Sequence, residues 1–147
     1  TPKMGLTSGG LSVGGTFVSS SDKRLKFNEK PLSNALGVIN QLEPVEYDQT
    51  YDLVDPYTLD TPQSHQCGFI AQSVQTIDEL KHAVVGGQVG DDGKETIRAL
   101  NYKAIFTYAV KAIQELSQIV KAQQVQINEL QQQFQNHLLT NFATLMS

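Results

Sequence analysis

Cysteine, tryptophan and charged residues are scarce in this 147-residue chain. The single cysteine, Cys67, excludes an internal disulfide and leaves no thiolate partner for a metal site. It stands beside apolar residues in HQCGFIAQ, so we expect an inert, buried thiol. Only 18% of the residues are charged and the formal net charge is −4, which argues against a general nucleic-acid-binding surface.

Other function classes are also missing their usual signals. No run of about 18 apolar residues is present, so we expect no membrane span. His65, His82 and His137 share no metal-ligand spacing, and SGGLSVGG lacks the following helix of a phosphate loop. We therefore expect no metal and no cofactor. The chain starts at Thr1 without a signal-peptide pattern, so we expect a fragment of a longer protein.

The remaining composition divides the chain into three parts. Residues 1–20 are rich in Gly, Ser and Thr, and Leu11, Val13 and Phe17 follow a strand period, which indicates the end of a β-rich stem. Residues 21–104 have the mixed pattern of a small α+β globular domain. Residues 105–147, preceded by a helical start at Tyr102, predict one long helix without Gly or Pro.

Within residues 21–104 the expected elements are short. Apolar spacing predicts a helix over residues 32–42, and VEYDQTY predicts a strand followed by a long polar loop over residues 51–66. CGFIAQSV indicates a buried strand that leads into a helix ending near Leu80. The segment GDDG predicts a hairpin turn rather than a calcium site, because the EF-hand spacing is absent.

The long helix carries a heptad seam that favours association between copies of the chain. The a positions are apolar, and two d positions are polar; the seam consists of Ile113, Leu116, Val120, Gln123, Ile127, Leu130, Phe134 and His137. Branched residues at a with Leu at d favour dimers, but the polar Gln123 and His137 layers weaken that rule. The alternative is a helix that packs on its own domain.

The stretch SSSDKRLK, residues 19–26, admits a structural and a chemical interpretation. It is either a polar turn or a nucleophile, Ser21, with its base, Lys26. A serine hydroxyl needs a group that takes its proton, and a lysine can do so only when it is neutral. Burial or the neighbouring charges of Lys23 and Arg24 would favour the neutral amine.

Four blocks then occur in one order: SDKRLKFNEKPL, LEPVEYDQ, CGFIAQSVQ and IRALNYKAIFTYAVKAIQELSQ. Together they resemble the endosialidase-type intramolecular chaperone family over about residues 14–130. These are C-terminal, self-cleaving peptidase domains of phage tail spikes, tail fibres and neck appendages.

The resemblance implies roles for particular residues. Ser21 and Lys26 would form a Ser–Lys dyad that cuts the chain between stem and chaperone. Asp22, Arg24 and Asn28 fall on supporting positions of the same motif, whereas Glu29 replaces the Ile that is often found there. The resemblance further implies a parallel homotrimer that contacts its own stem in the host cytoplasm during virion assembly. It implies no nucleic-acid or membrane partner.

The position of the cut follows from ring size. A serine attacks the carbonyl of the preceding residue through a five-membered ring, which favours the Ser20–Ser21 bond; attack by another group would leave the Ser21–Asp22 bond as the alternative. Two other functions stay open. One is a trimerisation domain that does not cleave, and the other is the self-cleaving domain of a membrane-tethered transcription factor.

Overall fold

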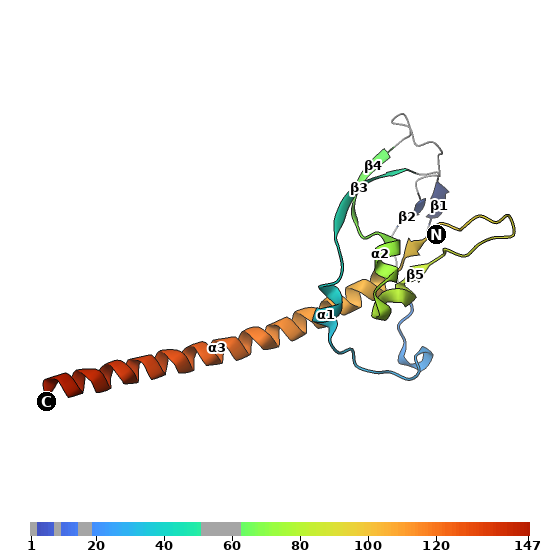
Figure 1. The fold of residues 1–147 in the computed structure, drawn as a ribbon. Helices are drawn as coiled ribbons and strands as arrows, with labels where there is room; N and C mark the ends of the chain where they lie inside the picture. Colours follow the sequence, from blue (N-terminus) through green and yellow to red (C-terminus); the bar gives the residue numbers. More distant parts are fainter. Residues whose placement is uncertain (1–2, 8–9, 15–18, 51–62) are drawn as a thin grey trace. The chain divides into compact units, whose positions relative to one another are not determined.

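A computed structural model describes residues 3–7, 10–14, 19–50 and 63–147 of the chain. Its fold is mixed α+β, with short strands and helices followed by one long C-terminal helix, as predicted (Figure 1). The strands pair into three separate two-stranded antiparallel sheets, β1–β2, β3–β4 and β5–β6. The elements are β1 (Lys3–Thr7), β2 (Gly10–Gly14), η1 (Lys23–Leu25), α1 (Ala35–Ile39), β3 (Val45–Thr50), β4 (Gln63–Gly68), α2 (Ala71–Gln75), η2 (Asp78–Ala83), β5 (Val84–Val85), β6 (Ala99–Leu100) and α3 (Tyr102–Met146).

The chain forms two compact units, and both are discontinuous in sequence. Unit 1 comprises Thr1–Pro31 and Glu43–Ile70, and unit 2 comprises Leu32–Leu42 and Ala71–Ser147. The predicted division into residues 1–20, 21–104 and 105–147 stays a prediction. The expected strand near Leu11 and Val13 is present as β2, whereas Phe17 lies outside the described residues.

Unit 1 consists of two hairpins and one short turn of helix. The β3–β4 ribbon pairs Val45 with Gly68 at one end and Thr50 with Gln63 at the other. Most of the expected polar loop, residues 51–62, lies outside the described residues, and its last part is strand β4. Among the unit 1 residues whose side chains the structure describes, none is buried.

The prediction for Cys67 was wrong: its side chain is exposed. Cys67 lies in β4 opposite Glu46, on a two-stranded ribbon, and a ribbon of two strands has no second layer of its own to cover a side chain. The apolar neighbours in sequence therefore did not determine burial here.

The buried core belongs entirely to unit 2 within the described residues. Small and branched apolar side chains from four elements fill it: Ala35, Val38, Val74, Ile77, Leu80, Ala83, Ile105 and Ala112. Only the first turns of α3 take part, since Ile105 and Ala112 are its buried residues. The core thus forms where α1 and η2 pack on the N-terminal part of the long helix, and α2 packs on η2.

A carboxylate from α3 caps the short helix α1. The expected helix over residues 32–42 is reduced to Ala35–Ile39 and starts after Asn34, which has a left-handed φ of 54° and makes no side-chain cap. Glu115 supplies the missing acceptor, because its Oε2 accepts a hydrogen bond of 2.8 Å from the backbone amide of Leu36. This hydrogen bond holds the pKa of the Glu115 carboxyl below its ordinary value, although desolvation opposes the shift.

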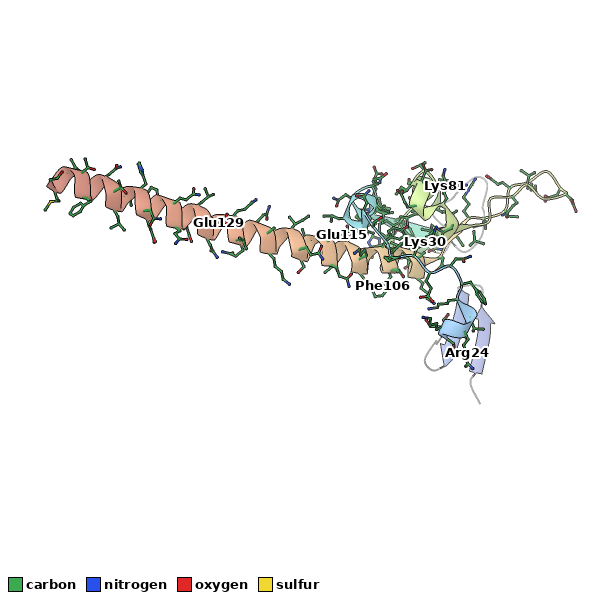
Figure 2. All side chains as sticks on the ribbon, turned by 90° about the horizontal axis from the view of Figure 1, so that it is seen from below. Arg24, Lys30, Lys81, Phe106, Glu115 and Glu129 are labelled. Carbon is green, nitrogen blue, oxygen red and sulfur yellow. The ribbon has the colours of Figure 1, made fainter. Side chains whose placement is uncertain are left out.

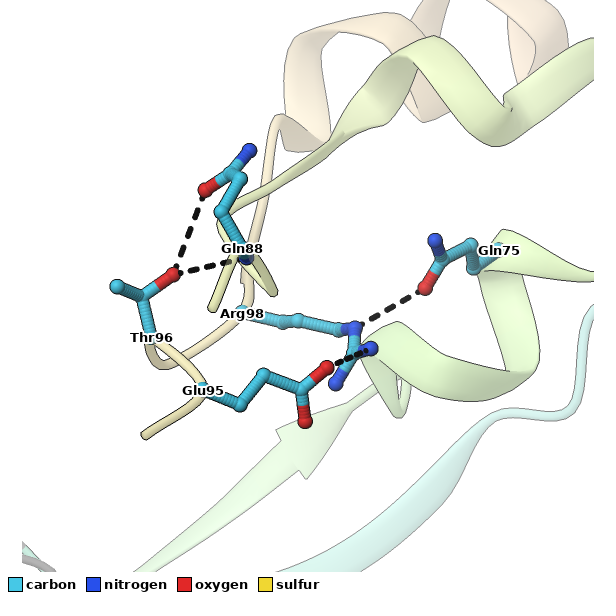
Figure 3. A network of polar contacts seen from close by, with 5 residues as sticks. All are labelled: Gln75, Gln88, Glu95, Thr96 and Arg98. Carbon is cyan, nitrogen blue, oxygen red and sulfur yellow. Dashed lines mark hydrogen bonds and ion pairs between the residues drawn. The ribbon is translucent and has the colours of Figure 1, made fainter. Parts of the chain in front are cut away.

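The hairpin from β5 to β6 projects from the core and has the predicted turn at GDDG. Gly93 has a φ of 74°, and the Gly90 amide donates to the Lys94 carbonyl at 2.8 Å. At its base, Arg98 Nε donates to Gln75 Oε1 of α2 at 3.0 Å, and the Arg98 guanidinium pairs with Glu95 at 2.5 Å (Figure 3). Arg98 therefore attaches the hairpin to α2.

The predicted helix from residue 71 to Leu80 is interrupted. Helix α2 ends at Gln75, and Ile77 has extended backbone angles before the 3₁₀ helix η2 starts at Asp78. The Ile77 side chain is only 5% exposed, so the break turns an apolar side chain into the core. Burial of Ile77 outweighs continuation of the helix.

The long helix α3 spans 45 residues without interruption, which is about 68 Å. Asn101 caps its start by accepting a hydrogen bond of 3.2 Å from the Lys103 amide. Every residue after Glu115 is exposed in the single chain. Among the described residues no helix combines the length and apolar character needed to cross a membrane.

The Glu115 cap predicts a stability that depends on pH. The folded-state pKa lies below the ordinary value of 4.5, so the stabilisation is complete above that pH and is lost as the pH falls through the folded pKa. Glu115→Gln keeps an acceptor oxygen but removes the charge. Urea unfolding should then show a smaller loss of stability on acidification than in the wild type. Glu129→Gln, at an exposed site on the same helix, is the control and should change nothing (Figure 2).

Candidate functional site

The SDKRLK segment folds into a single 3₁₀ turn, η1, which explains the spacing of its polar residues. The Leu25 amide donates to the Asp22 carbonyl at 3.1 Å, and the Lys26 amide donates to the Lys23 carbonyl at 3.0 Å. Asp22 caps the turn, because its Oδ1 accepts from the Arg24 amide at 2.8 Å. The turn reverses the chain between Ser21 and Lys26.

Asp22 and Arg24 form a clamp across this turn. Asp22 accepts from Arg24 Nε at 3.0 Å and from an Arg24 terminal nitrogen at 2.7 Å, a bidentate pair. The hydrogen bonds from Arg24 hold the pKa of the Asp22 carboxyl below its ordinary value, and the same pair raises the pKa of Arg24. The paired side chains of Asp22 and Arg24 therefore fix the backbone between Ser21 and Lys26.

The structure brings Ser21 and Lys26 into direct contact. Lys26 Nζ donates a hydrogen bond to Ser21 Oγ over 2.7 Å. This separation lies within the range over which a base can take a proton from a hydroxyl group. The two side chains come from the ends of η1, five residues apart, and the catalytic role of the pair stays a prediction.

The pair lies open to solvent in the single chain. Ser20, Ser21 and Lys26 are all exposed. The two apolar residues beside Lys26 are exposed as well, Leu25 by 67% and Phe27 by 83%. Exposure of a large aromatic side chain next to a polar pair marks a surface that gains stability when another surface covers it.

Asn28, the last supporting position, has a conformational role. Its φ is 54°, in the left-handed region where Asn is several-fold enriched over other non-glycine residues. The following Glu29, which departs from the usual pattern, lies 4.0 Å from Lys23 Nζ. Both side chains of this pair are exposed, so it contributes little to stability.

The other sequence blocks lie away from the motif in the chain. Gly68 ends β4, and Ala71 starts α2, so GFIAQ forms the connection between a strand and a helix. Tyr102 is the first residue of α3. The predicted seam residues all lie on α3 and are all exposed: Ile113, Leu116, Val120, Gln123, Ile127, Leu130, Phe134 and His137. Their burial between copies stays a prediction.

Two structural residues were missed from the sequence. Glu115 was assigned no role, because its partner amide is 79 positions away and leaves no local signal. Phe27 was not singled out either, although an aromatic residue next to the base of a predicted dyad could have drawn attention. No group of three or more His, Cys, Asp or Glu side chains in the described part of the chain could hold a metal ion.

Comparison with known protein families supplies the class of protein. The family model described as chaperone of endosialidase, Peptidase_S74, matches residues 21–85. The match starts at Ser21 and extends through β5. Residues 21–85 therefore match the endosialidase-type intramolecular chaperone family. No curated protein matches the chain.

The Asp22–Arg24 clamp predicts a shifted titration. In an NMR titration, the Asp22 side-chain carboxyl carbon should change with a midpoint below the ordinary value of 3.8. Arg24→Gln removes the charged, bidentate donor, so the midpoint should move up towards that value. Lys23→Gln, one residue away and paired with Glu29, is the matched control. An equal upward shift in both variants would show that general charge, not the clamp, sets the titration.

Proposed function

We propose that the chain is the C-terminal chaperone of a viral tail fibre or spike, which assembles as a parallel homotrimer and then releases itself by one cut beside Ser21. The observation that carries the proposal is the 2.7 Å contact between Lys26 Nζ and Ser21 Oγ, at the first residue of the family match. The domain acts as a serine peptidase with one turnover per chain. It works in the host cytoplasm during virion assembly, and the parent protein belongs to the virion tail.

The reaction needs only the dyad, the chain itself and one water molecule. The neutral amine of Lys26 takes the Ser21 hydroxyl proton while Oγ attacks the carbonyl carbon of Ser20. This attack closes a five-membered ring, whereas attack on the serine's own carbonyl would need a four-membered one. The intermediate then breaks the Ser20–Ser21 C–N bond, and the proton passes from Lys26 to the leaving amine. Water hydrolyses the resulting ester and frees the carboxylate of Ser20.

The protonation state of Lys26 is the switch in this scheme. A lysine in water is protonated near neutral pH, because its ordinary pKa is about 10.4, and it then cannot accept a proton from serine. The contact joins Lys26 Nζ and Ser21 Oγ directly, so no group has to move before a proton can pass between them. Burial would favour the neutral amine and reverse the direction of the hydrogen bond. Assembly is the proposed source of that burial.

Two features of unit 1 support a covering partner. Leu25 and Phe27, on either side of Lys26, present exposed apolar surface to it. The described side chains of unit 1 also include no buried residue, so the unit has little internal stabilisation. A neighbouring copy in a trimer would cover this apolar surface and would at the same time remove water from the dyad.

In the proposed order, the copies assemble first and the chain is cut afterwards, which gives cleavage a role in assembly. Intertwined β stems have high contact order and assemble slowly, and a terminal trimerisation domain raises the effective concentration of their ends. Once the copies are aligned and the dyads are covered, cleavage removes the chaperone. Assembly then becomes kinetically irreversible, because the released stem has lost the element that registered it.

The dyad predicts two inactive variants. The wild-type chain should yield fragments of residues 1–20 and 21–147 by mass spectrometry, whereas Ser21→Ala and Lys26→Ala should each stay intact. Both variants should still assemble, because neither residue lies on α3. Ser20→Ala is the control and should still be cut. A wild-type chain that assembles but never splits would indicate a trimerisation domain without peptidase activity. Cleavage at the same bond in either dyad variant would refute the assignment.

The coupling of cleavage to assembly predicts a second result. Ile127→Asp combined with Leu130→Asp places several carboxylates in adjacent layers of the predicted seam, which should weaken association by several kcal/mol. Sedimentation should then report monomers, and the chain should stay uncut. By circular dichroism the globular domain should lose little of its own secondary structure, because the buried residues end at Ala112. A monomer that cleaves at the wild-type rate would exclude the coupling.

A further inference from the structure

The predicted heptad seam loses its apolar character after Phe134. Continued at heptad spacing, its next positions are His137, Asn141 and Thr144, which are all polar. Helix α3 nevertheless continues to Met146 without a break. Large apolar residues are abundant in this last part, but they occupy other positions, namely Leu138, Leu139, Phe142, Leu145 and Met146.

An 11-residue spacing places nine of the twelve large apolar side chains that are exposed after Glu115 on one stripe, and Val125, Leu139 and Met146 lie outside it. Leu116, Ile127 and Leu138 are separated by eleven positions, and so are Gln123, Phe134 and Leu145. Each repeat starts at Leu116, Ile127 or Leu138. The starting residue and the residues three, four and seven positions after it lie on one stripe of the helix. Its apolar members are all exposed in the single chain: Leu116, Ile119, Val120, Ile127, Leu130, Phe134, Leu138, Phe142 and Leu145.

The geometry of a continuous helix separates the two alternatives at neighbouring residues. Successive side chains are about 100° apart around the axis of an α-helix. Relative to Ile127, Leu138 is displaced by about 20° and His137 by about 80°, whereas relative to Leu130 the two values are exchanged. Leu138 therefore continues the line of Ile127, and His137 continues the line of Leu130. The apolar Phe142 and Leu145, against the polar Asn141 and Thr144, favour the line through Leu138.

We infer that residues 116–145 of α3 associate with a second copy of the chain along this 11-residue stripe rather than along heptads. The inference rests on the proposed assembly, and it adds which residues of the helices meet and the handedness of their supercoil. A repeat of 11 residues corresponds to 3.67 residues per turn and gives a right-handed supercoil, whereas heptads give a left-handed one. Leu138 is then buried between copies, and His137 is not.

The length of the stripe identifies a copy of α3 as the occupant. Residues 116–145 extend over about 45 Å, and only a helix of similar length can cover a stripe that continuous. The other α-helices in the described part of the chain, α1 and α2, have 5 residues each. Beyond Glu115 no other element of unit 2 lies against α3 (Figure 2). A second copy supplies the matching helix with the matching spacing.

Neighbouring substitutions test the inference on the complete 147-residue chain. Leu138→Asn and His137→Asn introduce the same side chain one position apart, so they differ mainly in the helix face that they alter. Leu138→Asn should weaken association, measured by sedimentation equilibrium, by about tenfold or more, because it places an amide in a buried layer. His137→Asn should change it by less than about twofold. Equal effects, or a larger effect at His137, would overturn the 11-residue seam.

The double variant Ile127→Asp with Leu130→Asp separates this inference from the proposed function, because both residues belong to either seam. If it is monomeric and the wild type assembles, while Leu138→Asn behaves as the wild type, only the 11-residue seam is wrong. If the wild type is itself monomeric, the inference and the proposed assembly fail together.

Cross-linking gives an independent measurement that does not depend on affinity. In a Cys67→Ala background, Leu138→Cys should form a disulfide between copies under mild oxidation, because identical core positions of parallel helices face one another. His137→Cys should form it much more slowly. Faster cross-linking at His137 than at Leu138 would contradict the stripe, whatever the sedimentation result.

Discussion

The contact between the Glu115 carboxylate and the amide of Leu36 joins the two sequence segments of unit 2. Helix α1 has only 5 residues and starts at a left-handed Asn34 without a cap of its own, so it depends on α3 for its first hydrogen-bond acceptor. In return, α1 and η2 cover Ile105 and Ala112 of α3. Because the buried residues of α3 lie only in its first turns, the rest of the long helix is exposed along its length in the single chain.

Stability is distributed very unevenly between the two units. Every buried apolar residue of the described chain lies in unit 2, whereas the motif with Ser21 and Lys26 lies in unit 1. Among the side chains of unit 1 that the structure describes, none is buried. This exposure agrees with the proposed single cut, for which neighbouring copies would have to supply the burial.

Local patterns predicted the elements that local forces determine. The uninterrupted helical composition predicted α3, GDDG predicted the hairpin turn, and the spacing of Ser21 and Lys26 predicted a contact that a 3₁₀ turn creates. Features set by distant partners could not be predicted in this way. The Glu115 cap joins residues far apart, and the break at Ile77 follows from burial against other elements. Cys67 is exposed on a two-stranded ribbon, and in the described part of the chain no third strand joins this ribbon, which the apolar neighbours of Cys67 could not reveal.

The composition of the distal helix has a consequence for the conditions in which copies associate. After Glu115, α3 carries Lys121 and Glu129 as its only Lys, Arg, Asp or Glu residues. Salt screens charged contacts but leaves apolar ones largely intact, so association of such a helix should be nearly independent of ionic strength. Apolar contacts weaken on cooling, however. The proposed assembly should therefore persist in dilute and concentrated salt alike, and weaken in the cold.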